Sequence, residues 1–173
     1  MKSIGARAKA VYDNLPLPGG SAAGIVAVLV LHRVRRAPIP GSRALQLTAG
    51  TAMLVVGGVM NVWALAERRR RTSGEFQLEQ SQSVVTTGPY AFSRHPMYAG
   101  WWAVHLGAGL LRGSAWVAAT LPVAVILEHY YGSLVEERRL RERFGEEYAR
   151  YAMRVPRYLG RRHPPPRERD QSR

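Results

Sequence analysis

Residues 88–100, with the sequence GPYAFSRHPMYAG, are the stretch that decides how this chain is organised. A polar, turn-rich segment ends there and an apolar helix is predicted to begin. Pro96 suits the first turn of that helix, because the N–H that proline lacks would have no helical partner at that position. The stretch therefore predicts a boundary between polar and apolar surroundings, with Arg94, His95 and Tyr98 at its edge.

Four apolar blocks lie on the two sides of this boundary. A helix of about 20 mostly apolar residues, within a range of about 17–25, crosses a bilayer. Ala44–Ala66 and Ser114–Val135 reach that length, and Met97–Leu111 is slightly shorter. Leu15–Leu31 is the weakest block, since prolines and glycines dilute it. The pattern predicts an all-α fold: a polytopic membrane helical bundle of about four transmembrane helices with cytoplasmic C-terminal helices.

The charge of the chain is strongly basic. The formal net charge is +13, from 25 Lys plus Arg against 12 Asp plus Glu. Such a balance suits anionic lipid, cytoplasmic loops or nucleic acid. No basic groove with interleaved aromatic residues and no nucleic-acid-binding motif is visible, so membrane lipids are expected as partners and nucleic acid is not.

The distribution of these basic residues predicts the orientation in the membrane. With both termini cytoplasmic, 20 of the 25 lysines and arginines fall on the inner side. Basic loops remain on the cytoplasmic side, so we predict an integral protein of the inner or plasma membrane with cytoplasmic termini. Arg33, Arg35 and Arg36 oppose the rule locally, and they would lie inside if the first block does not cross.

Cysteine is absent, which excludes disulfides, thiolate metal sites and cysteine nucleophiles. No metal site is predicted from the remaining residues. The first fourteen residues are charged and no small-residue cleavage site follows, so we expect no signal peptide and an uncleaved first anchor.

Single positions are expected to shape the helices. Arg112–Ser114 should form the turn between the last two spans, Pro122 should bend the fourth span, and Gly145 should split the C-terminal helix. A polar loop is expected from Glu67 to Ser93, with an extended piece near Ser83–Thr87. The second span is expected to be a packed interior helix because of its small and polar residues, Gly50, Gly57, Gly58 and Asn61.

Ionisable residues near the predicted helix ends are the candidates for chemistry. The free N–H groups at the start of the helix that follows His95 would suit an anionic group such as a carboxylate. Glu136 and Glu137 lie at the end of the fourth span, and Glu128 and His129 lie inside it. An ionised residue at the centre of a membrane helix costs roughly 2.5–3.5 kcal/mol, so Glu128 is expected to face a cavity or a partner. The alternative for the whole set is ordinary anchoring at a membrane surface.

Two groups of motifs occur in a fixed order. The opening group is Gly88-Pro89-Tyr90, Arg94-His95-Pro96, Tyr98 and Gly100, and the closing group is Glu136-Glu137, Phe144-Gly145, Tyr148, Tyr151 and Val155-Pro156. Their order resembles the isoprenylcysteine carboxyl methyltransferase and phospholipid methyltransferase superfamily of integral membrane enzymes. The resemblance covers residues 88–157 and ends before Tyr158, and the N-terminal half carries no motif.

The resemblance implies an S-adenosylmethionine-dependent methyltransferase. Methyl transfer would go to an oxygen, of a carboxylate or of a phenol or enol, in a lipophilic acceptor within the membrane. The cofactor-binding residues implied are Tyr90, His95, Pro96, Tyr98, Gly107, Gly109, Glu136 and Glu137. Glu137 and Arg143 are the predicted catalytic residues. Arg143 is preferred over Arg94 and Arg157 as the acceptor ligand, on the expectation that a break at Gly145 returns it to the pocket.

The apolar blocks, the motifs and the composition of the C-terminal tail together predict three regions. Residues 1–87 would hold the N-terminal spans and a cytoplasmic loop, residues 88–159 the catalytic hairpin and the C-terminal cofactor-binding helices, and residues 160–173 a disordered basic tail. Two other functions stay open: an NADPH-dependent membrane reductase of the sterol-reductase type, and a non-enzymatic lipid-binding membrane protein. The oligomeric state is not predicted.

Overall fold

The structure is a computed structural model that describes residues 18–71 and 83–159. Within these two ranges the chain is helical and contains no β-strand, which confirms the predicted all-α class. The helices are α2 (Gly19–Val34), α3 (Arg43–Arg70), α4 (Pro96–Arg112), α5 (Val117–Leu127) and α6 (Leu134–Arg154), with a 3₁₀ turn η1 (Gly88–Ala91) and a π-helical segment η2 (Glu128–Ser133). The predicted C-terminal tail lies outside the described residues.

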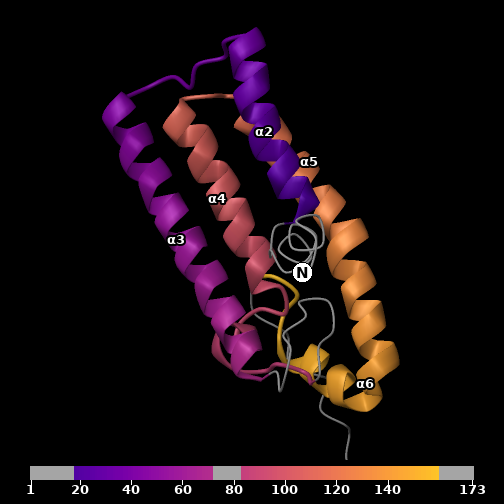
Figure 1. Cartoon of the computed structure of the whole chain (residues 1–173). Coiled ribbons are helices and arrows are strands. Elements are labelled where there is room, and N and C mark those ends of the chain that lie inside the picture. The colour runs from indigo at the N-terminus through magenta and orange to yellow at the C-terminus, as the bar shows by residue number, and fades with distance from the viewer. Residues whose placement is uncertain (1–17, 72–82, 160–173) are drawn as a thin grey trace, which may run out of the picture.

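Helix α4 occupies the centre of the bundle. It packs against α2, α3 and α5, whereas α3 packs mainly against α4 along one flank (Figure 1). Val55, Val59 and Val62 are exposed on the outward face of α3. The prediction that the second apolar block is an interior helix is therefore wrong. Gly50, Gly57 and Asn61 of α3 serve the contact with α4, and the face of α3 that carries these valines is exposed.

Glycines set the close contact between α3 and α4. A Cβ added at Gly57 would lie 2.4 Å from the Gly100 carbonyl oxygen, and one added at Gly107 would lie 2.8 Å from the Gly50 carbonyl oxygen. The two glycines on each helix are seven residues apart, which places them on the same face. Backbone approach of this kind is typical of helix pairs in membranes.

The turn between α4 and α5 has the predicted position. Gly113 ends α4 with a left-handed backbone, φ +65°, which favours glycine. Arg43 Nη2 donates to the Leu111 carbonyl at 2.6 Å and so satisfies one of the last carbonyl groups of α4. The fourth helix begins at Val117, because Ser114 belongs to this turn and pairs with Pro38 in an isolated bridge.

The last helical run departs from α-geometry at two places. The chain continues without a gap from α5 through η2 into α6, and Figure 1 shows them as one bent rod. The predicted break occurs at Gly145, whose φ of 48° and ψ of −121° are not helical. The helix passes through Pro122, and the π-helical hydrogen bonding follows at Glu128, which the sequence did not predict.

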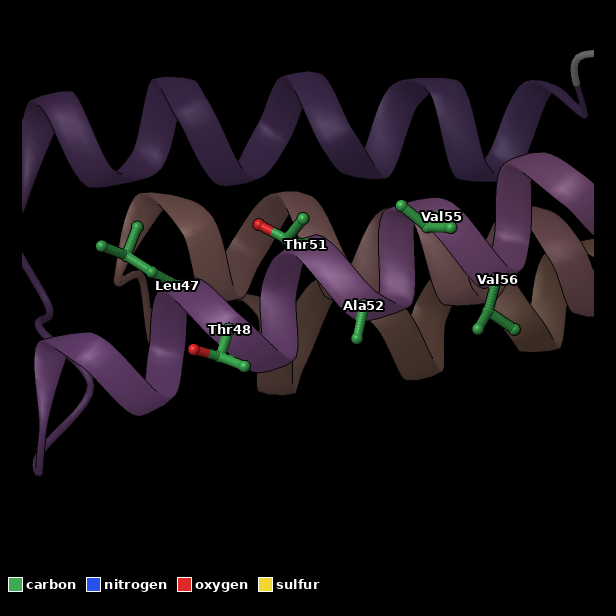
Figure 2. A pocket seen from close by; sticks show the side chains of 6 residues that line it. All are labelled: Leu47, Thr48, Thr51, Ala52, Val55 and Val56. Carbon is green, nitrogen blue, oxygen red and sulfur yellow. The ribbon is translucent and has the colours of Figure 1, made fainter.

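The segment between α3 and α4 differs from the prediction at its start. Helix α3 runs on to Arg70, beyond Glu67, where the polar loop was predicted to begin. Residues 83–87 are irregular and form no strand. One helix in the described ranges, α3, is long and apolar enough to cross a membrane, and α2 is a shorter apolar helix. A shallow groove on the outward face of α3 is lined by Leu47, Thr48, Thr51, Ala52, Val55 and Val56 (Figure 2).

Candidate functional site

Glu137 is the centre of a buried charged cluster at the start of α6. Its Oε1 lies 3.1 Å from Nε2 of His95, and its Oε2 lies 3.2 Å from Nη1 of Arg94. Arg157 donates to both oxygens, from Nε at 2.8 Å and from Nη2 at 2.9 Å. Only 3% of Glu137 is exposed. Two arginines and a histidine thus converge on one carboxylate from two distant parts of the chain.

The surroundings of Glu137 keep its carboxyl group ionised. Burial by itself would raise the pKa. The hydrogen bonds from His95 and Arg157 and the charge of Arg94 outweigh burial and hold the pKa of Glu137 well below its ordinary value. The side chain is therefore an anion at neutral pH, and its oxygens are already occupied by protein donors.

Backbone hydrogen bonds join the two halves of this cluster. The Arg94 N–H donates to the Pro156 carbonyl at 2.9 Å, and the His95 N–H donates to the Arg157 carbonyl at 3.1 Å. The Ser93 hydroxyl donates to the same Arg157 carbonyl at 3.2 Å. The segment after α6 thus lies against the segment before α4, so the opening and closing motifs form one site.

Glu136 takes the more accessible position beside this cluster. Its Oε2 lies 3.6 Å from His95 Nδ1, its Oε1 lies 3.6 Å from Arg68 Nη1, and its side chain is 34% exposed. A cavity of about 30 Å³ adjoins it, enough for about one water molecule. The cavity is lined by Arg68, Arg94, Glu136, Tyr90, Tyr148 and Tyr151, among others.

Tyrosines close the polar side of the cavity. The Tyr151 hydroxyl donates to the Tyr90 carbonyl at 2.8 Å, which ties α6 to the turn η1. Burial raises the pKa of Tyr90 to about 12, so the phenol keeps its proton at neutral pH. Tyr148 is fully buried and packs edge-on against Tyr151. These residues form one wall of the cavity.

An aromatic cluster adjoins His95. The rings of His95 and Tyr98 are 5.5 Å apart, and Tyr158 stands 4.8 Å from Trp102 and 6.0 Å from His95. The Tyr158 hydroxyl donates to Ser133 Oγ at 2.9 Å.

The position of Tyr158 was not found from the sequence, where the motif match ended one residue too early. His129 Nδ1 also lies 2.9 Å from its hydroxyl. The available signal was its place two residues after the matched Val155-Pro156 pair. Pro96, by contrast, is buried in the first turn of α4, as predicted.

Three predicted site residues lie elsewhere. Gly107 faces α3, and Gly109 faces Val117, whose Cβ would lie 2.4 Å from an added Cβ. They are 12 and 14 residues beyond His95, about 18–21 Å along the helix axis, so both have packing roles. Arg143 is exposed on α6, with its guanidinium 5.6 Å from the Phe144 ring. The break at Gly145 follows Arg143 and does not turn it inward; Arg94 and Arg157 reach Glu137 instead.

Comparison with known proteins gives the family. The family model for phospholipid methyltransferases matches residues 45–147, which include Arg94, His95, Glu136 and Glu137. No three potential ligand residues in the described ranges form a group that could hold a metal ion.

The chain also resembles curated proteins. It is 28% identical to protein-S-isoprenylcysteine O-methyltransferase B of Arabidopsis thaliana, over 62% of this chain and 55% of that protein. It is 31% identical to a probable protein-S-isoprenylcysteine O-methyltransferase of Oryza sativa subsp. indica, over 61% and 56%. It is 35% identical to the cobalt-zinc-cadmium resistance protein CzcN of Cupriavidus metallidurans, over 47% and 38%. The chain spans about half the length of the plant relatives it matches. By the family match and the joined motifs, this chain belongs to the phospholipid methyltransferase family, within the superfamily that includes the isoprenylcysteine O-methyltransferases.

Proposed function

We propose that this protein is an integral membrane methyltransferase that uses S-adenosylmethionine to methylate an oxygen of a lipophilic acceptor. One observation carries the proposal. The cluster that joins Arg94 and His95 to Glu136 and Glu137 lies at the polar end of apolar helices, within the range that the family model matches.

The surface of the bundle supports its placement in a bilayer. Large apolar side chains are exposed on α3 and α5, including Val59, Val62, Val123 and Ile126. In water such surfaces are unfavourable, whereas hydrocarbon accommodates them. Helix α4, with 17 residues, is about 26 Å long, close to the hydrocarbon thickness of about 30 Å. The proposed arrangement has four spans, with α6 and both termini on the cytoplasmic side.

The residues around His95 suit the amino-acid end of S-adenosylmethionine. The Nε atom of Arg94 is buried and has no hydrogen-bond acceptor among the described residues, so it can donate to a carboxylate. Glu136, which is partly exposed, can accept from an ammonium group or from ribose hydroxyls. The cavity of about 30 Å³ is much smaller than the cofactor, so the surrounding segments must move apart when it binds.

The bound cofactor supplies an electrophilic methyl group on a sulfonium. The protein's part is to align an oxygen nucleophile with that group and to exclude water. Glu137 holds His95, Arg94 and Arg157 in place. Arg157, whose side chain is 31% exposed, is the arginine best placed to hold an acceptor carboxylate, which needs no general base. The relatives named isoprenylcysteine O-methyltransferases favour a carboxylate over a phenol or enol.

Calorimetry on the detergent-purified protein tests the cofactor. We expect binding of S-adenosylmethionine and none of NADPH. Glu136→Gln should weaken S-adenosylmethionine binding about tenfold, the effect of losing one charged hydrogen bond. Glu146→Gln is the matched control, because that carboxylate is 93% exposed on the same helix. Binding of NADPH alone would support the reductase, and binding of neither would support a non-enzymatic protein.

Transfer of labelled methyl groups in membranes tests the acceptor. We expect an S-farnesylated cysteine with a free carboxylate to be methylated, and a short-chain S-alkyl cysteine to be methylated poorly. Each buried CH₂ contributes about 0.8 kcal/mol, so the loss of five or more carbons should be plainly visible. Equal turnover of the two acceptors would contradict a binding site open to the bilayer.

A further inference from the structure

Glu128 is a buried carboxylate for which the proposed chemistry has no use. It lies on η2, next to the aromatic cluster, and 4% of it is exposed. Its Oε2 accepts a hydrogen bond from Trp102 Nε1 at 2.6 Å, and its Oε1 accepts one from the backbone N–H of Ser21. Both oxygens are therefore occupied, by donors from two different helices.

These bonds hold three helices at one point. Trp102 belongs to α4, Ser21 to the first turn of α2, and Glu128 to the π-helical segment. Gly20 lets α2 come close, since an added Cβ would lie 3.0 Å from Glu128 Cγ. The first turn of α2 has no side-chain cap of its own, and Glu128 supplies an acceptor for one of its free N–H groups.

The π-helical segment presents several residues to α4 and Tyr158. Ser133 and His129 meet the Tyr158 hydroxyl, and Gly132 leaves room for Tyr98, whose hydroxyl would lie 2.5 Å from an added Cβ. π-helical turns widen a helix face and occur often at functional sites. The Trp102 ring, fixed by Glu128, stands against Tyr158. The Glu128 carboxylate thus holds Trp102, and through Trp102 it acts on the aromatic pair that Trp102 forms with Tyr158.

We propose that Glu128 is a positioning residue for the lipophilic acceptor: through Trp102 it fixes the aromatic wall, formed by Trp102 and Tyr158, against which the acceptor's apolar chain lies. The inference rests on the proposed function. Glu136 and Arg94 line the small cavity, whereas Tyr158 of the wall lies against His129 and Ser133 of η2. The wall's apolar ring faces suit a prenyl or long alkyl chain next to the reacting oxygen.

The experiment uses Glu128→Gln and Trp102→Phe in the full chain. In the wild type the two carboxylate oxygens of Glu128 accept from Trp102 and from the Ser21 N–H. A glutamine side chain has one acceptor oxygen, so Glu128→Gln loses one of these two hydrogen bonds. We expect Glu128→Gln to raise both the KM and the Kd for a fluorescent S-farnesylated cysteine about tenfold, with kcat and S-adenosylmethionine affinity unchanged within about threefold. Trp102→Phe should have a similar effect, since it removes the donor and leaves the wall unanchored.

The double variant separates positioning from general damage. In the Trp102→Phe variant the indole donor is already absent, and a glutamine at position 128 can still accept from the Ser21 N–H. Adding Glu128→Gln should therefore raise Kd by less than about twofold. Loss of thermal stability with unchanged Kd and KM, or independent multiplicative effects, would overturn the inference. Tight binding of the farnesylated probe without methyl transfer would overturn the proposed function alone. A wild-type protein that binds no lipophilic probe would overturn both.

Discussion

The flank of α4 that faces α3 and the N-terminal end of α4 are held by different forces. Along α3, Gly100 and Gly107 let the two backbones approach closely, and the contact there depends mainly on close packing. At the start of α4, His95 and its neighbours are held by ions and hydrogen bonds around Glu137. The comparison teaches that the pairing of α3 with α4 and the assembly of the site are separable, so substitutions should damage one without the other.

The largest effect is expected from Glu137→Gln. The change leaves the buried Arg94 without its counter-ion, and breaking a buried pair in this way costs about 3–5 kcal/mol. Thermal unfolding in detergent, followed by circular dichroism, measures the loss. Glu146→Gln should change stability by less than about 1 kcal/mol, since its ion pair with Arg150 is exposed. Equal effects of the two variants would mean that the cluster is solvated.

The contribution of Glu137 should also depend on pH. Its pKa is lowered in the folded state, so the unfolded chain binds the proton first as the pH falls. The stability difference between wild type and Glu137→Gln should be constant from pH 8 to about pH 5 and should shrink below the ordinary carboxyl pKa of about 4.3. Unfolding curves of both proteins between pH 3 and 8 provide the test. A difference that grows on acidification would contradict the sign of the shift.

Gly57→Ala tests the glycine contact between α3 and α4. The new methyl group would meet the Gly100 carbonyl at 2.4 Å, where only backbone can yield, so we expect a loss of about 1–3 kcal/mol. Gly58→Ala is the control, because nothing lies within 4 Å of its added Cβ, and higher helix propensity should stabilise α3 slightly. The test compares the melting temperatures of Gly57→Ala and Gly58→Ala in the same detergent. S-adenosylmethionine affinity should be the same in Gly57→Ala and wild type at a temperature where both are folded.

The smallest effect is expected from Tyr151→Phe. The variant loses the bond to the Tyr90 carbonyl and keeps the ring packing, which predicts a loss of about 0.5–1.5 kcal/mol. The unfolding free energy should fall while the pairing of α3 with α4 persists. A loss as large as that of Glu137→Gln would show that the site is held by its tyrosines more than by its charges.

Local sequence determined the helical segments and their breaks. The apolar blocks predicted α3, α4 and α5. Gly113 and Gly145 predicted a turn and a kink, and the structure confirms both. These features depend on residues close in the chain, through backbone geometry and hydrophobic length. Motif order also indicated the family, which the comparison shows.

Tertiary structure alone decided which side chains meet. Helical periodicity places a residue on a face but does not name the partner of that face, so Arg143 was preferred where Arg157 reaches Glu137. Gly107 looked like part of a binding motif and proved to face α3. Tyr158 entered the aromatic cluster only because backbone bonds between segments about sixty residues apart carry it there. Contacts of that range depend on the packing of the whole bundle, which no local pattern encodes.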